Sequence, residues 1–96
     1  MEVLRPYEDS GNIRTFSEDI DEEELIWHRD KEDRIITVIE GKNWKLQIDN
    51  QLPIEMESGE DYFIGNMVYH RLLKGEGKLI LKINRMEKKN GNKTRR

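Results

Sequence analysis

Residues 27–41 read WHRDKEDRIITVIEG, and this stretch decides how the rest of the chain is interpreted. His28 and Asp30 stand two positions apart, so an extended strand would present both side chains on one face. A charged turn follows, and then the β-branched run 35–39, which is typical of a strand. The second of the two histidines, His70, lies in another apolar segment far along the chain. Two imidazoles and one carboxylate suit non-haem iron and similar ions, so a metal site is expected if folding joins these residues.

The composition indicates one small domain. A chain of 96 residues has no room for a second hydrophobic core. Hydrophobic residues make up 34% and charged residues 39%, which suits a small barrel or sandwich with a solvated outer surface. A chain of this size gains stability from pairing, so we expect a homodimer.

Several classes of site and location are excluded by residues that the sequence lacks. The chain contains no cysteine, which removes disulfides, thiolate catalysis and cysteine-ligated metal sites. No apolar run approaches the length of a membrane span, and the acidic N-terminal region does not resemble a signal peptide. We therefore expect a cytoplasmic protein with no membrane partner.

Charge is distributed unevenly between the two ends of the chain. Residues 1–33 hold 12 acidic and 4 basic side chains, whereas residues 71–96 hold 10 basic and 2 acidic ones. The basic end would suit either a phosphate or nucleic-acid contact, or a solvated strand edge followed by a loose tail. We expect the second, with no nucleic-acid partner. Residues 87–96, EKKNGNKTRR, contain no apolar residue and are predicted to form a disordered tail.

Short strands separated by turn residues are expected along most of the chain. Pro53 cannot donate to a ladder and marks an edge strand, and the acidic segment 18–24 is expected to be a loop or a single helical turn. This pattern predicts an all-β barrel or sandwich. The expected strands are residues 13–17, 25–29, 34–40, 44–48, 52–56, 62–64, 67–73 and 78–83.

The stretch around His28 resembles the first sequence motif of the cupin superfamily, the small double-stranded β-helix barrels. That motif reads roughly H-x-H, a few residues, E, and then a hydrophobic strand that closes at glycine. Here the strand 34–40 closes at Gly41. Counting back from Gly41, His28 stands at the first histidine, Asp30 at the second histidine and Arg34 at the glutamate.

The second cupin motif, roughly P-x-G-D-x-x-x-I-P, four residues, then H, is also recognisable. Gly59, Ile64 and His70 keep its spacing, while Glu57 and Gly65 replace the prolines. The likeness covers about residues 24–84 and implies a single-domain jelly-roll barrel over residues 1–86. The phrase WHRDKEDR also resembles that of short cupin-like proteins encoded by bacteriophages.

A usual cupin site offers three histidines and a glutamate to a divalent ion. By resemblance this chain would offer His28, Asp30 and His70, which leaves coordination positions open for a substrate, dioxygen or water. The expected ion is Fe(II), with Mn(II), Ni(II) and Zn(II) as alternatives. Asp30 has a second interpretation, because aspartate often caps a turn such as 30–33.

Arg34 allows two interpretations of the site, because a guanidinium stays protonated and cannot ligate a metal. In the first, the metal is bound and Arg34 clamps the carboxylate or phosphate of a substrate. In the second, Arg34 replaces the charge of the metal and pairs with Asp30, and the barrel binds a small polar ligand without metal. A site with no catalytic role is a third possibility.

The resemblance implies a metal-binding small cupin, either an oxygenase or a lyase/isomerase acting on a small anionic molecule or a sugar. Arg34 and Tyr62 are the candidate catalytic residues, the first as an anion clamp and the second for proton transfer, with Glu32 and Asp33 as further proton-transfer candidates. The rival hypothesis is a non-catalytic ligand-binding or regulatory cupin module without metal, since cupins share a barrel across both roles.

Strand alternation predicts which side chains line the barrel interior. Trp27 and Tyr69, which precede the two histidines, should point to the outer face. A pocket that is polar at one end and aliphatic deeper is typical of a small-ligand site. Besides His28, Asp30 and His70, the expected inward residues are Arg34, Ile36, Val38, Leu46, Ile48, Ile64, Val68, Leu72, Leu79, Leu81 and Ile83.

Overall fold

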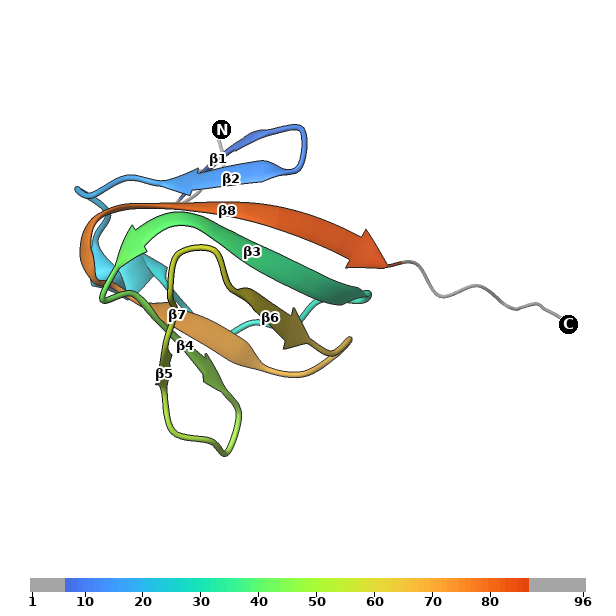
Figure 1. The fold of residues 1–96 in the computed structure, drawn as a ribbon. Coiled ribbons are helices and arrows are strands. Elements are labelled where there is room, and N and C mark those ends of the chain that lie inside the picture. The colour runs from blue at the N-terminus through green and yellow to red at the C-terminus, as the bar shows by residue number, and fades with distance from the viewer. Residues whose placement is uncertain (1–6, 87–96) are drawn as a thin grey trace, which may run out of the picture.

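The computed structural model describes residues 7–86, which form two antiparallel β-sheets (Figure 1). The first sheet has five strands in the order β1-β2-β8-β3-β6, and the second has three in the order β5-β4-β7. The all-β prediction is therefore confirmed. The elements are β1 (Glu8–Ser10), β2 (Ile13–Phe16), the 3₁₀ turn η1 (Glu22–Glu24), β3 (Asp33–Lys42), β4 (Lys45–Ile48), β5 (Ile54–Glu55), β6 (Asp61–Ile64), β7 (His70–Leu73) and β8 (Glu76–Met86).

The hydrophobic core lies between the two sheets and is built by strand alternation. In the pair β3–β8, Ile36 lies opposite Ile83 and Val38 opposite Leu81, and all four side chains are buried. Each apolar side chain of this size stabilises the fold by about 1.5–3 kcal/mol when it leaves water. The remaining buried core residues are Phe16, Ile20, Trp44, Leu46, Met56, Ile64 and Leu79.

Segment 25–29 is not a strand, contrary to the prediction. It contributes one isolated bridge, in which His28 N–H donates to His70 O at 3.0 Å and His70 N–H donates to His28 O at 2.9 Å. The acidic turn η1 precedes this segment and the charged turn after Asp30 follows it, so the extended run is too short to pair further. The single bridge nevertheless joins the two histidine backbones.

The strand β1 is not among the strands expected from the sequence. Glu8–Ser10 pairs with β2, and the two strands are connected by a turn at Gly11 and Asn12. Gly11 has a φ of 62°, which glycine adopts without steric cost. The polar strand β1 gave no apolar alternation because it is exposed along its length.

The expected strand 67–73 begins only at His70, because Met67 lies in a turn with a φ of 61°. Two other local predictions agree with the structure. Segment 52–56 supplies an edge strand, although only Ile54–Glu55 pairs. The acidic segment forms the single turn η1, where the Asp21 side chain accepts a hydrogen bond from Glu23 N at 3.0 Å. The predicted disordered tail, residues 87–96, lies outside the described residues.

Within residues 7–86, no helix is long and apolar enough to span a membrane. Trp27 and Tyr69 lie on the surface with 39% and 43% of their area exposed, as expected. The homodimer and the cytoplasmic location stay predictions.

Candidate metal centre

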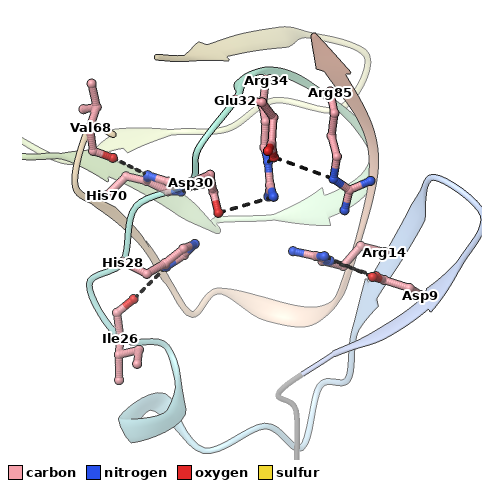
Figure 2. A network of polar contacts seen from close by, with 10 residues as sticks. All are labelled: Asp9, Arg14, Ile26, His28, Asp30, Glu32, Arg34, Val68, His70 and Arg85. Carbon is pink, nitrogen blue, oxygen red and sulfur yellow. Dashed lines mark hydrogen bonds and ion pairs between the residues drawn. The ribbon is translucent and has the colours of Figure 1, made fainter. Parts of the chain in front are cut away.

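His28, Asp30 and His70 come together at one end of the space between the sheets (Figure 2). Their candidate ligand atoms all lie within 4.8 Å of one another, and the two imidazole ring centroids are 4.3 Å apart. His70 is buried at the start of β7, and the isolated bridge aligns His28 beside it. The structure thus brings together the three residues that the sequence nominated as ligands.

The hydrogen bonds of the two imidazoles fix which nitrogen faces the site. His28 Nδ1 lies 3.1 Å from Ile26 O, and His70 Nδ1 lies 2.9 Å from Val68 O. A carbonyl oxygen only accepts, so each Nδ1 carries the proton and each neutral ring keeps its lone pair on Nε2. Metal-ligating histidines are usually oriented in this way, with the other ring nitrogen donating to a backbone carbonyl.

His70 is held in the neutral form that a metal requires. Burial lowers the pKa of His70 below its ordinary value, and this effect outweighs the hydrogen bond to the Val68 carbonyl, which acts in the opposite direction. The Nε2 lone pair of His70 is therefore available at neutral pH.

Asp30 divides its two carboxylate oxygens between two neighbours. Oδ1 lies 3.3 Å from Arg34 Nη2, whereas Oδ2 lies 3.4 Å from His70 Nε2. Oδ2 is buried and forms no hydrogen bond with any described residue. Leaving such an atom unsatisfied costs about 1–3 kcal/mol or more. A carboxylate oxygen that faces a histidine lone pair without a proton between them is satisfied by a cation, so the donor set fits a divalent metal ion.

Arg34 faces the site, as the sequence predicted, and its charge is already compensated. Its Nε donates to Glu32 Oε2 at 2.7 Å, and Arg85 Nε lies 3.8 Å from the same oxygen. The ion pair of the second interpretation therefore exists, yet it uses only one oxygen of Asp30 and leaves the other directed at His70. The arginine pairs with this carboxylate and leaves Asp30 Oδ2 and His70 Nε2 facing each other.

The Asp30 carboxylate, alternatively expected to cap the turn 30–33, contacts Arg34 and His70 instead, and Asp33 links the start of β3 to the loop before β7. The Asp33 carboxylate accepts from Asn66 N at 2.8 Å and from Asn66 Nδ2 at 2.9 Å. The Asp33 carboxylate is thus hydrogen-bonded to the loop that contains Asn66, and the Asp30 carboxylate is directed into the site.

The three residues open onto a cavity of about 280 Å³. Most of the residues expected to face inward line it, whereas Val38 and Leu79 are buried in the core, Ile48 packs against the core, and Val68 precedes β7 and contributes its carbonyl. The lining residues are Tyr7, Arg14, Phe16, Glu24, Leu25, Ile26, His28, Asp30, Arg34, Ile36, Leu46, Ile64, His70, Leu72, Leu81 and Ile83.

Arg14 is a cavity residue that the sequence interpretation missed. It lies on β2 two positions before Phe16, and both side chains face the cavity. The alternation within the expected strand 13–17 was the sequence feature that would have revealed it, because residues i and i+2 share a face.

Comparisons with known proteins agree with this architecture at the level of the fold. No protein-family model matches the chain, and no curated protein matches it in sequence. A solved structure of the protein NMB1881 from Neisseria meningitidis superposes with a TM-score of 0.56 at 16% identity, over 91% of this chain and 88% of that one. A cupin-2 domain containing protein from Shewanella frigidimarina superposes with a TM-score of 0.51 at 22% identity, over 82% of this chain and 76% of that one.

The chain has a cupin-like fold. The double-stranded barrel expected from the two sequence motifs is thus confirmed, while the likeness to phage-encoded proteins stays a prediction. By the sequence resemblance, Asp30 and Arg34 correspond to the second histidine and the glutamate of the first cupin motif. The structure shows these two side chains as an ion pair at the edge of the histidine pair.

The structure does not bring Tyr62 to the site. Tyr62 packs against the core and does not line the cavity described above, and its hydroxyl accepts a hydrogen bond from Glu57 N at 2.8 Å. The hydroxyl thus links β6 to the loop before it and does not reach the three candidate ligands.

Replacing Tyr62 with phenylalanine is therefore expected to destabilise the fold without changing metal affinity. Loss of the hydrogen bond to Glu57 N should lower the free energy of unfolding by about 1 kcal/mol. Urea denaturation measures the first quantity and calorimetric metal titration the second. A weaker metal affinity in a folded Tyr62→Phe protein would show that the Tyr62 hydroxyl contributes to the site after all.

Proposed function

We propose that this protein is a small cupin that binds one divalent metal ion through His28 Nε2, His70 Nε2 and Asp30 Oδ2. The observation that carries the proposal is the convergence of two histidine lone pairs on a buried carboxylate oxygen that has no other hydrogen-bond partner among the described residues. The backbone carbonyls of Ile26 and Val68 act as the supporting groups that fix both imidazoles.

The proposed ion is Fe(II), with Mn(II), Ni(II) and Zn(II) as alternatives. Two imidazole nitrogens and one carboxylate suit all four ions and leave positions open for a ligand. The metal would supply Lewis acidity or, for iron, oxygen chemistry at those open positions.

Charge compensation in the cavity supports a small anionic ligand. Arg34 is compensated by Asp30 and Glu32, and Arg14 by Asp9. A dication bound by the two histidines and Asp30 would add two positive charges at the polar end of the cavity. An anionic molecule would offset that added charge, and the apolar walls exclude competing water.

The proposed activities are an oxygenase or a lyase/isomerase reaction at this centre. In either case the described side chains bind and orient: the histidines and Asp30 hold the metal, Arg34 pairs with the other oxygen of Asp30, and the aliphatic walls enclose the ligand. A non-catalytic, metal-free binding module is the alternative, and the Arg34–Asp30 ion pair favours it, because a guanidinium already neutralises this carboxylate.

Metal titration separates these functions. Protein purified without an affinity tag and freed of metal by chelation would be titrated anaerobically with Fe(II), and separately with Mn(II) and Zn(II), in a calorimeter. We expect one ion per chain, retained on desalting and measured by elemental analysis. Oxygen uptake by the Fe(II) form with small carboxylic acids would then identify an oxygenase. A protein that retains no ion at any of these steps would contradict the metal-binding function.

A further inference from the structure

Arg14 presents a second guanidinium to the cavity, from the side opposite the histidines. Its side chain is only 12% exposed, and its Nε and Nη2 donate to the two carboxylate oxygens of Asp9 at 2.8 and 3.0 Å. Its guanidinium carbon lies 3.7 Å from the ring centroid of Tyr7. The end of the guanidinium that faces away from Asp9 points toward His28 (Figure 2).

These contacts hold the Arg14 side chain in place and leave some of its N–H donors available to a ligand. A guanidinium has five N–H donors in a rigid plane, and Asp9 takes only the edge formed by Nε and Nη2. Among the described residues, the hydrogen bonds of the Arg14 side chain all go to Asp9. The Tyr7 ring packs edge-on to Phe16 with centroids 5.5 Å apart, so the platform under the guanidinium is itself anchored in the core. The edge of the guanidinium that Asp9 does not contact, called the free edge below, is held in place and can donate hydrogen bonds to a planar anion.

The walls between Arg14 and the metal centre are apolar. Apart from the metal triad, Arg34, Arg14, Glu24 and the edge of Tyr7, the described lining residues carry only hydrocarbon side chains. A sugar would bury many hydroxyl groups there without partners, at about 1–3 kcal/mol each. The apolar lining residues are Phe16, Leu25, Ile26, Ile36, Leu46, Ile64, Leu72, Leu81 and Ile83.

We infer that the cavity binds a small monocarboxylic acid with an apolar body, whose carboxylate is held by the free edge of Arg14 in front of the metal centre. The apolar body lies against the aliphatic walls. The volume of about 280 Å³ lies at the lower end of ligand pockets, which suits a molecule of about the size of benzoate. This inference rests on the metal site proposed above, and it narrows the ligand from anions and sugars to apolar carboxylic acids.

Three probes of defined chemistry test the ligand class on zinc-loaded protein. Benzoate and benzamide have the same shape and differ in charge, and glucose is a polar molecule of comparable size. Isothermal calorimetry should show binding of benzoate, at least about tenfold weaker binding of benzamide, and no binding of glucose. Equal affinities for benzoate and benzamide, or a preference for glucose, would overturn the inference.

The Arg14→Gln variant tests the residue. Loss of charge-assisted hydrogen bonds should weaken benzoate binding by about 10- to 100-fold, while benzamide and zinc affinities stay at their wild-type values. Arg85→Gln is the matched control, because Arg85 contacts Glu32 but does not line the cavity. Arg14→Lys keeps a cation beside Asp9 and loses the planar edge, so it should weaken benzoate binding even if the glutamine variant does not fold.

The outcomes distinguish this inference from the proposed function. If wild-type protein binds no zinc, the metal site fails and the inference fails with it. If zinc binds normally and Arg14→Gln and Arg14→Lys both keep the wild-type ratio of benzoate to benzamide affinity, the metal site stands and the role of Arg14 is refuted.

Discussion

Replacing His70 with alanine is expected to abolish metal binding while the barrel stays folded. His70 supplies one of three protein ligands, and its Nε2 faces Asp30 Oδ2 at 3.4 Å. Losing an outer-shell partner of a ligand already costs about 10- to 100-fold in metal affinity, so losing the ligand itself should raise the Kd by more than about 100-fold. Competition with a chromophoric chelator measures the change for Zn(II) and Mn(II).

Tyr69→Ala is the matched control for this experiment. Tyr69 is the neighbouring residue, points to the outer surface, and contacts the Arg29 guanidinium instead of the site. Its replacement should leave the metal affinity unchanged. A folded His70→Ala protein with wild-type affinity would show that the metal, if bound, lies elsewhere.

Replacing Arg34 with glutamine is expected to have two effects of opposite direction. The side chains of Arg34 and Asp30 are each only 13% exposed, so removal of the guanidinium leaves the carboxylate without its partner. The metal-free protein should lose about 3 kcal/mol of its free energy of unfolding. The same change removes a cation from beside the metal and should tighten metal binding by roughly tenfold.

Urea denaturation with and without Zn(II) measures both effects in one series. The destabilisation should be largest without metal and smaller when the ion restores positive charge next to Asp30. Arg85→Gln serves as the control, because Arg85 is more exposed and its ion pair among the described residues is with the outer carboxylate, Glu32. Weaker metal binding by Arg34→Gln would mean that the arginine is needed to position Asp30 as a ligand.

The fold was predictable because its strongest determinants are local. The alternation in β3 and β8 indicates a sheet with one buried face. The connectivity of the barrel was expected from the resemblance of the segments 28–41 and 57–70 to the two cupin motifs. The strand β1 could not be predicted in this way, since an exposed edge strand has no buried face to impose an alternating pattern.

The residues of the candidate site could be predicted from the sequence, but the geometry of their side chains could not. Two histidines and a carboxylate in strand-like segments are a chemically distinctive set, and the structure joins them. What the sequence could not show is the division of the two Asp30 oxygens between Arg34 and His70, because that depends on side-chain geometry across two sheets. For the same reason Tyr62, plausible by residue type, lies outside the site, and Arg14 belongs to the cavity.

Of the two interpretations of Arg34 that the sequence left open, the structure shows the Arg34–Asp30 ion pair of the second, and the presence of the metal that the first requires stays a prediction. A guanidinium on Oδ1 and a metal on Oδ2 can share one carboxylate, and the charge of the arginine is further compensated by Glu32. A cupin-like barrel alone does not decide between catalysis and binding. The proposed metal-dependent function and the metal-free alternative differ in whether the site formed by His28, Asp30 and His70 binds an ion.

Anomalous X-ray diffraction from crystals grown with Zn(II) tests that claim most directly. We predict one anomalous peak per chain, at about 2.0–2.2 Å from His28 Nε2, His70 Nε2 and Asp30 Oδ2. The peak should be absent from crystals of the His70→Ala protein. No peak between the two imidazoles of the wild-type protein at saturating zinc would contradict the metal centre.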